Sequence, residues 1–128
     1  MWIVDANVIL RYVLDDHAEL SQKARRIIDE QAVEIPVEVL CEVVYVLSNL
    51  YQVSSKDIGD ALTGFLESTA CALPHREALL KALKLYSLYS LDFVDCLLAA
   101  YYEIENISIH TFDTKLNKLL ALIAETKK

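Results

Sequence analysis

Apolar residues recur at helical spacing along most of the chain. In residues 18–31, for example, Leu20, Ala24 and Ile28 fall on one face of a helix. The same periodicity, with cap residues at several of the ends, predicts seven helices. They are expected at residues 7–14, 18–31, 37–51, 54–67, 76–89, 93–103 and 114–123.

Short β-prone runs separate these helices. Residues 1–4, 33–35, 71–73 and 107–112 are apolar or β-branched, and Pro36 and Pro74 directly follow or end two of them. Strands that alternate with helices are typical of an α/β domain with a parallel sheet. At 128 residues the chain is expected to form a single domain, residues 1–128.

The helix expected at residues 37–51 is apolar on nearly every side. Such a helix is typically buried all round. Glu42 interrupts it, and Asp95 interrupts the equally apolar helix expected at residues 93–103. We therefore expect both carboxylates to lie in apolar surroundings, where they need a partner, a proton or a metal ion.

The composition excludes several classes of function. Only two glycines are present, so the chain contains neither a glycine-rich dinucleotide motif nor a P-loop. The hydrophobic content of 55% excludes a disordered chain. A formal net charge of −7 argues against non-specific attachment to nucleic acid or to an anionic membrane.

The three cysteines indicate a reducing compartment. Cys41, Cys71 and Cys96 are odd in number, far apart and embedded in apolar sequence, so we expect buried thiols. No apolar run is long enough to span a membrane, and Asp5 interrupts any secretory signal at the N-terminus. These features predict a cytoplasmic protein.

Two acids follow predicted strands. Asp5 comes after the first strand and Asp113 after the fourth, where parallel sheets usually place functional groups. The alternative is that each is a helix N-cap, because Asp is favoured at that position.

The acids have no basic residues near them in the sequence. Neither Lys nor Arg occurs in residues 27–55 or in residues 85–114, which contain Glu42, Asp95 and Asp113. Several carboxylates without counter-charge suggest a shared cation, and ligand sets made only of oxygen favour Mg²⁺ or Mn²⁺. Such an ion suits phosphodiester hydrolysis. The alternative is that the acids are helix caps and solvated surface residues.

Four segments together resemble the PIN-domain family, especially the VapC-type toxins. They occur in the family's order and spacing, and the resemblance extends from residue 3 to about residue 120. The segments read VDANVILRYVL at residues 4–14, VLCEVVYVL at 39–47, LDFVDCLLAA at 91–100 and TFDTKL at 111–116.

This resemblance implies a three-layer α/β/α fold with a short central parallel sheet of four or five strands. It also implies a metal-dependent endoribonuclease that uses Mg²⁺ or Mn²⁺ to hydrolyse RNA. The positions that match the family's acidic quartet, which would bind metal and act in catalysis, are Asp5, Glu42, Asp95 and Asp113.

Three further positions match supporting residues of the family. Asn7 and Thr111 match small polar residues that support the acids, although Asn7 also suits a helix cap and Thr111 an ordinary strand position. Asp92 is an accessory acid or the N-cap of its helix.

The resemblance also implies partners. Family members form homodimers and are commonly held by a small antitoxin protein that blocks the acidic pocket. For the RNA substrate, the available contacts are basic residues such as Arg11, Lys115 and Lys118, which otherwise form solvated helix faces.

Two rival functions remain. The first is a catalytically silent protein- or RNA-binding module in which the acids are structural. The second is a phosphatase of the haloacid dehalogenase type, but that chemistry needs a second Asp two residues after the first, where this chain has Asn7.

Overall fold

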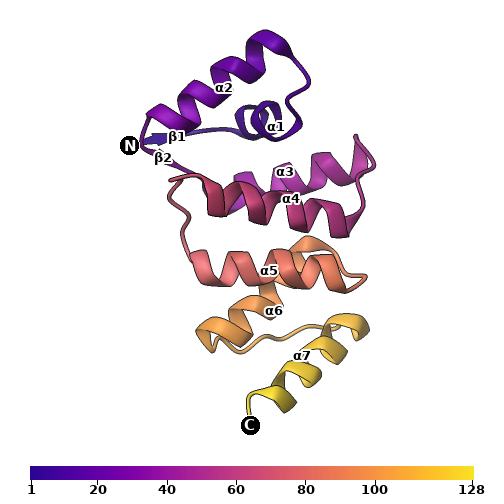
Figure 1. Ribbon diagram of the computed structural model, residues 1–128. Coiled ribbons are helices and arrows are strands. Elements are labelled where there is room, and N and C mark those ends of the chain that lie inside the picture. Colours follow the sequence, from indigo (N-terminus) through magenta and orange to yellow (C-terminus); the bar gives the residue numbers. More distant parts are fainter.

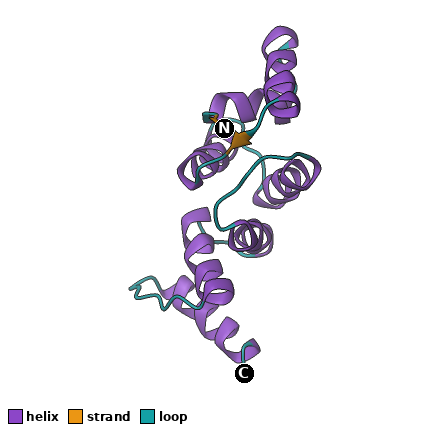
Figure 2. Ribbon diagram, turned by 90° about the vertical axis from the view of Figure 1, so that its left-hand side faces the viewer, coloured by secondary structure: helices purple, strands orange, loops and turns teal.

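The computed structural model describes all 128 residues as a largely helical α/β protein. Seven helices and two short strands follow one another along an elongated stack, with the N-terminal elements at one end and the C-terminal helix at the other (Figures 1 and 2). The elements are β1 (Trp2–Ile3), α1 (Ala6–Leu14), α2 (Ala18–Glu30), β2 (Val33–Glu34), α3 (Val37–Asn49), α4 (Ser55–Ser68), α5 (Arg76–Leu88), α6 (Phe93–Glu105) and α7 (Thr114–Thr126).

All seven predicted helices are present within a few residues of the expected bounds. Local capping explains several starts, because the side chains of Asp5, Ser54 and Asp113 each accept a hydrogen bond from a backbone N–H of the helix that follows. Asn106 ends α6 in the left-handed conformation, which Asn tolerates better than most residues.

The sheet is smaller than the sequence suggests. β1 and β2 pair in parallel, with Trp2 opposite Val33, and the run at 71–73 contributes a single parallel bridge from Ala72 to Glu34. The prediction of four or five strands, and with it a three-layer arrangement, is not found in this structure. The α/β character and the parallel direction of the sheet are confirmed.

Residues 107–112 form no strand because no strand edge is within their reach. The outer edge of β1 lies near the N-terminal end of the stack, and helices α3 to α5 separate it from the segment that joins α6 to α7 (Figure 1). In this segment the Ile107 N–H donates to the Tyr101 carbonyl and so continues the end of α6 rather than a sheet.

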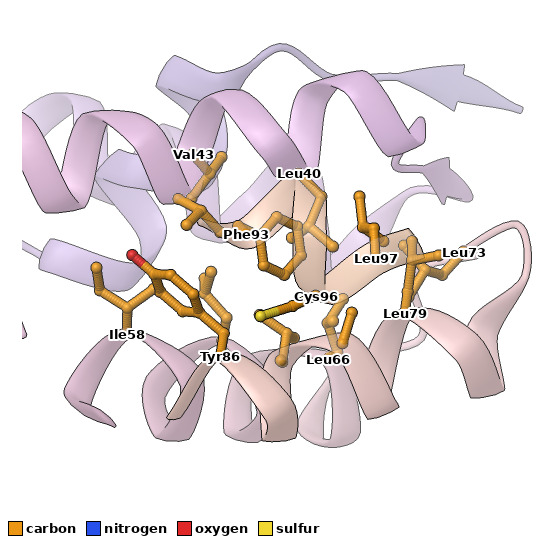
Figure 3. Packing of buried hydrophobic residues seen from close by; sticks show 14 of the residues in the cluster. Leu40, Val43, Ile58, Leu66, Leu73, Leu79, Tyr86, Phe93, Cys96 and Leu97 are labelled. Carbon is orange, nitrogen blue, oxygen red and sulfur yellow. The ribbon is translucent and has the colours of Figure 1, made fainter. Parts of the chain in front are cut away.

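The core lies between the helices of the stack. Leu40 and Val43 of α3 meet Phe93 and Leu97 of α6 in one continuous cluster, to which α4 and α5 also contribute (Figure 3). Tyr86 of α5 packs edge-to-face on Phe93 with ring centroids 5.7 Å apart. The core therefore fixes the turn between α5 and α6, which borders the candidate site.

Helix α3 is not buried all round as the sequence predicts. Its buried residues are Leu40, Val43, Val44 and Leu47, whose spacing defines one face. Glu42 is exposed. The prediction of an apolar setting for Glu42 is therefore wrong, because only one face of α3 is covered by the helices that pack on it.

The thiols largely follow the prediction. Cys71 and Cys96 are buried, Cys41 is half-buried, and none forms a disulfide. Burial, with a smaller effect of Asp95 and Asp92, raises the pKa of Cys96 to about 12. The thiol of Cys96 is therefore neutral at physiological pH.

We predict that the two glycines of α4 respond oppositely to alanine. A Cβ at Gly59 would lie 2.8 Å from the Leu83 carbonyl oxygen and 2.9 Å from the Ser87 Cβ, whereas nothing lies within 4 Å at Gly64. We expect Gly59→Ala to lower the free energy of unfolding by about 1–3 kcal/mol through overpacking. Gly64→Ala should raise it by up to about 1 kcal/mol through helix propensity.

Urea denaturation of the two variants measures this difference directly. Gly64→Ala is the matched control, since it makes the same chemical change in the same helix. Equal effects of the two substitutions would show that α4 and α5 do not approach each other closely at Gly59.

Candidate functional site

Three of the predicted acids line one cleft at the start of α6 and α7, here called the acidic cleft. Asp92 immediately precedes α6, Asp95 lies in its first turn, and Asp113 immediately precedes α7. The short turn after α5 and the first turn of α7 form its walls, including Ser90 and Lys115. The starts of two helices thus bring together Asp92 and Asp113, which are 21 residues apart in the sequence.

Each acid of this cleft is held differently. The Asp113 Oδ1 accepts a hydrogen bond from the Leu116 N–H at 2.8 Å, so Asp113 caps α7 as well as facing the cleft. Asp92 occupies the N-cap position of α6 but makes no side-chain cap bond. The Asp92 carboxylate is therefore not tied to the helix that it precedes.

Thr111 supports Asp113 through a local turn. The Asp113 N–H donates to the Thr111 Oγ1 at 3.0 Å, and the Asn117 Nδ2 donates to the Thr111 carbonyl at 2.9 Å. The two bonds join the loop before α7 to the first turns of that helix. Thr111 is therefore a positioning residue for Asp113 rather than a strand residue.

The acidic cleft concentrates negative charge. None of Asp92, Asp95 and Asp113 forms an ion pair. Partial burial raises the pKa of Asp95 above its usual value, and the nearby carboxylates of Asp113 and then Asp92 raise it further. The cleft is thus an environment that a cation would stabilise.

The other predicted acids line a second cleft, here called the N-terminal cleft. Asp5 and Asn7 at the start of α1 face Glu42 of α3 across it, together with Arg11. The Asp5 Oδ1 accepts a hydrogen bond from the Val8 N–H at 3.3 Å. Asp5 therefore caps α1, as its alternative interpretation suggested, while it also lines the cleft.

Arg11 is already engaged in the N-terminal cleft. Its Nη1 lies 2.8 Å from the Asp16 Oδ1, and its Nη2 donates to the Tyr51 hydroxyl at 2.9 Å. The bond to Tyr51, followed by the charge of Asp16, raises the pKa of Arg11. Neither Asp5 nor Glu42 has a basic partner.

Helix α3 separates the two clefts. Glu42 and Val46 of α3 line the N-terminal cleft, while Val44 and Tyr45 line a groove that faces Asp95. The four acids of the predicted quartet are thus divided into two pairs, Asp5 with Glu42 and Asp95 with Asp113. No three His, Cys, Asp or Glu side chains form a group able to hold a metal ion.

Three residues that border the two clefts are not among the predicted site residues. Tyr89 and Ser90 border the acidic cleft from the turn after α5, and Tyr51 borders the N-terminal cleft. These residues lie outside the four family-like segments, and a single Tyr or Ser carries no spacing signal. Only the arrangement of the helices reveals them.

A comparison with protein families identifies the family of this chain. The family model of the PIN domain matches residues 2–121. The chain belongs to the PIN-domain family. PIN domains are generally nucleases, and mostly ribonucleases. No curated protein and no solved structure matches the chain.

The helices of this PIN domain are short compared with a lipid bilayer. None is long and apolar enough to cross a membrane. The longest, α4, has 14 residues.

We predict that Asp95→Asn stabilises the PIN domain in the absence of divalent ions. Because the pKa of the Asp95 carboxyl is raised in the folded state, the charged form is disfavoured there, and folding is weakest above that pKa. At pH 7 the substitution should raise the free energy of unfolding by up to about 1 kcal/mol. The gain should shrink as the pH falls through the Asp95 pKa and the carboxyl becomes protonated.

Urea unfolding in chelator at pH 7 and pH 4 provides the measurement. Glu67→Gln is the control, because Glu67 is an exposed, unpaired acid on α4 and should change little at either pH. Destabilisation by Asp95→Asn at pH 7 would contradict the charge repulsion inferred in the cleft.

Proposed function

We propose that this PIN domain is a Mg²⁺- or Mn²⁺-dependent endoribonuclease that hydrolyses RNA phosphodiester bonds. We further propose that it is the toxin of a VapC-type toxin–antitoxin pair and that it acts in the cytoplasm. Membership of a nuclease family supports the reaction type. The motif segments around Asp5, Glu42, Asp95 and Asp113 support the subfamily.

The acidic cleft is the observation that carries this proposal. Its carboxylates repel one another, have no ion-pair partner and provide only oxygen ligands. Mg²⁺ is commonly bound by one or two carboxylates, with water and substrate phosphate completing its shell. The donor set of the cleft fits such an ion, although no three groups converge on one point.

Asp95 and Asp113 would hold the metal in the acidic cleft, with Asp92 as the accessory acid. Asp5 and Glu42 would complete the quartet only if the N-terminal cleft approached the acidic cleft. When bound, the metal supplies a water of lowered pKa and neutralises charge on the phosphate.

The chain's own residues also have roles in this proposal. Lys115 lines the acidic cleft and has no ion-pair partner, so its ammonium group is available to a phosphate. The Leu116 N–H and Thr111 hold Asp113 at the rim. In the N-terminal cleft Asn7 would support Asp5, and Arg11 would contact RNA only by leaving Asp16.

Partners are part of the same proposal. Large apolar side chains are exposed on both halves of the chain, among them Trp2 at 64% and Leu88 at 65%. Surfaces of this kind favour protein contacts. We propose a homodimer and a small antitoxin protein that covers the acidic pocket.

A second candidate function is a catalytically silent protein- or RNA-binding module. One observation favours it: no group of three metal-binding side chains forms in the structure. In that case the acids act as helix caps, as Asp5 and Asp113 do here.

We predict that the purified protein cleaves single-stranded RNA only with Mg²⁺ or Mn²⁺. Chelation should abolish cleavage, and Asp95→Asn should reduce its rate on the order of 100-fold or more, since loss of even an outer-shell partner of a metal costs 10–100-fold. Gel analysis of a labelled RNA pool measures both effects, with Glu67→Gln as the control. Cleavage that persists in chelator or in Asp95→Asn would indicate a contaminant or a metal-independent reaction.

We also predict that Mn²⁺ binds more tightly as the pH rises. Metal ligands must be deprotonated, and Asp95 binds its proton more tightly than an ordinary Asp. Affinity should therefore increase most steeply across the Asp95 pKa. Isothermal calorimetry of the wild type and Asp95→Asn tests this, and a wild type that releases no heat with Mn²⁺ would reject the metal site.

A further inference from the structure

An apolar groove adjoins the acidic cleft, here called the α7 groove. One wall is the turn after α5, with Tyr89 and Leu91, and the other is a face of α7, with Leu119 and Leu122. Both the turn and the start of α7 lie at the right-hand side of the stack in Figure 1. The groove is therefore built from the same two elements as the acidic cleft.

The α7 face combines cationic and apolar side chains at regular spacing. Lys115, Lys118, Leu119 and Leu122 stand at positions i, i+3, i+4 and i+7 and so share one side of the helix. Leu119 is buried at the base, while Leu122 is 51% exposed. Neither lysine forms an ion pair, which leaves two ammonium groups free at the rim.

Tyr89 presents the one aromatic ring of this groove. It is 38% exposed and takes part in none of the aromatic pairs of the structure, unlike Tyr86, which is buried against Phe93. Its hydroxyl makes no hydrogen bond with another side chain. The ring is thus free to stack on a planar ligand.

The groove and the acidic cleft are continuous. Tyr89, Ser90, Leu91 and Lys115 line both. A chain molecule whose phosphate occupied the acidic cleft would therefore place its next unit between Tyr89 and α7. Repeating phosphates and flat apolar bases are the two features that such a lining recognises.

We propose that the α7 groove is a binding subsite for one nucleotide of single-stranded RNA beside the phosphate that is cleaved. The base stacks on Tyr89 and packs against Leu122, and Lys118 binds the flanking phosphate. This subsite rests on the proposed nuclease function, because its position follows from a phosphate in the acidic cleft. Two unpaired lysines at the rim favour a nucleic acid over an apolar protein segment.

The expected effects follow from general magnitudes of base stacking and phosphate contacts. Loss of one base–aromatic stack weakens single-strand binding by about 5- to 150-fold. Loss of one phosphate contact lowers the slope of log affinity against log salt by about 0.7. Affinity and salt slope are both measured on the Asp95→Asn protein, so that cleavage of the RNA does not interfere.

The test uses the full chain carrying Asp95→Asn and a fluorescein-labelled single-stranded RNA of mixed sequence. Fluorescence anisotropy should show that adding Tyr89→Ala weakens binding about 5- to 150-fold, whereas Tyr89→Phe retains affinity. Lys118→Ala should weaken binding and lower the salt slope. The controls Trp2→Ala and Lys84→Ala alter an exposed aromatic ring and an exposed ammonium group away from the acidic cleft and the α7 groove, and should change neither.

Several outcomes would overturn the subsite. They are no RNA binding by the Asp95→Asn protein, equal affinity with and without Tyr89→Ala, and equal losses for Tyr89→Ala and Trp2→Ala. If Tyr89→Ala or Leu122→Glu instead changes only the sedimentation of the protein, the groove is a contact between copies of the chain. Circular dichroism confirms that each variant is folded.

Failure of the subsite and failure of the nuclease function give different results. If the wild type cleaves RNA but Tyr89→Ala leaves affinity unchanged, the subsite is wrong and the nuclease stands. If the wild type does not cleave but Tyr89→Ala weakens binding, the groove binds RNA and the nuclease proposal is wrong.

Discussion

The packing of α5 between α4 and α6 is the constraint on which the rest of the C-terminal half depends. The backbone of α5 approaches α4 at Gly59, where a side chain would collide with the Leu83 carbonyl. On the other side Tyr86 meets Phe93 edge-to-face. Because interiors are close-packed, these contacts hold the turn between α5 and α6 in one place. That turn presents Tyr89 at its start and Asp92 at its end, so the core determines where the acidic cleft and the α7 groove meet.

Charge distribution is the second constraint. Partial burial and neighbouring carboxylates oppose ionisation of Asp95, and no basic side chain compensates for them. The lysines of α7 lie beside the acids but form no ion pair with them. The surface charge therefore changes from negative in the acidic cleft to positive along the α7 groove. A divalent ion in the cleft would reverse the local sign where a phosphate must bind. The formal charge of −7, which alone disfavours a nuclease, is therefore partly a property of one site.

Sequence patterns predicted the helices well because helix formation is a local property. Periodicity located all seven, and cap residues such as Ser54 and Asp113 marked where two of them begin. Strands depend on a partner that the sequence does not identify. The run at 107–112 has β-prone residues but reaches no strand edge, and the run at 71–73 reaches β2 through one bridge only.

Burial was harder to predict than helicity for the same reason. An apolar helix is covered only where neighbouring elements pack on it. The four buried residues of α3, which include Val43, all lie on one face of the helix. Glu42 consequently lies in the open, while Asp95 is half-buried. The family-like segments predicted a single quartet of acids, whereas in the structure Asp95 and Asp113 line one cleft and Asp5 and Glu42 another, because the arrangement of the helices decides which acids lie together. Tyr89 was not among the predicted site residues, since its place beside the acidic cleft depends on the position of α7.

The division of the acids into two pairs has a consequence for how a metal site would assemble. Asp95 and Asp113 are fixed by helix starts that the core holds in place, and Thr111 adds a further restraint on Asp113. Asp5 is fixed in the same way at the start of α1, whereas Glu42 is an exposed residue within α3. Two carboxylates with water suffice for Mg²⁺, so the acidic cleft needs no contribution from the N-terminal pair to attract the ion. Asp5 and Glu42 could act as ligands of the same ion only if α3 moved so that the N-terminal cleft met the acidic cleft. Because Val44 and Leu47 anchor α3 in the core, such a movement would have to displace buried side chains and would carry their packing cost.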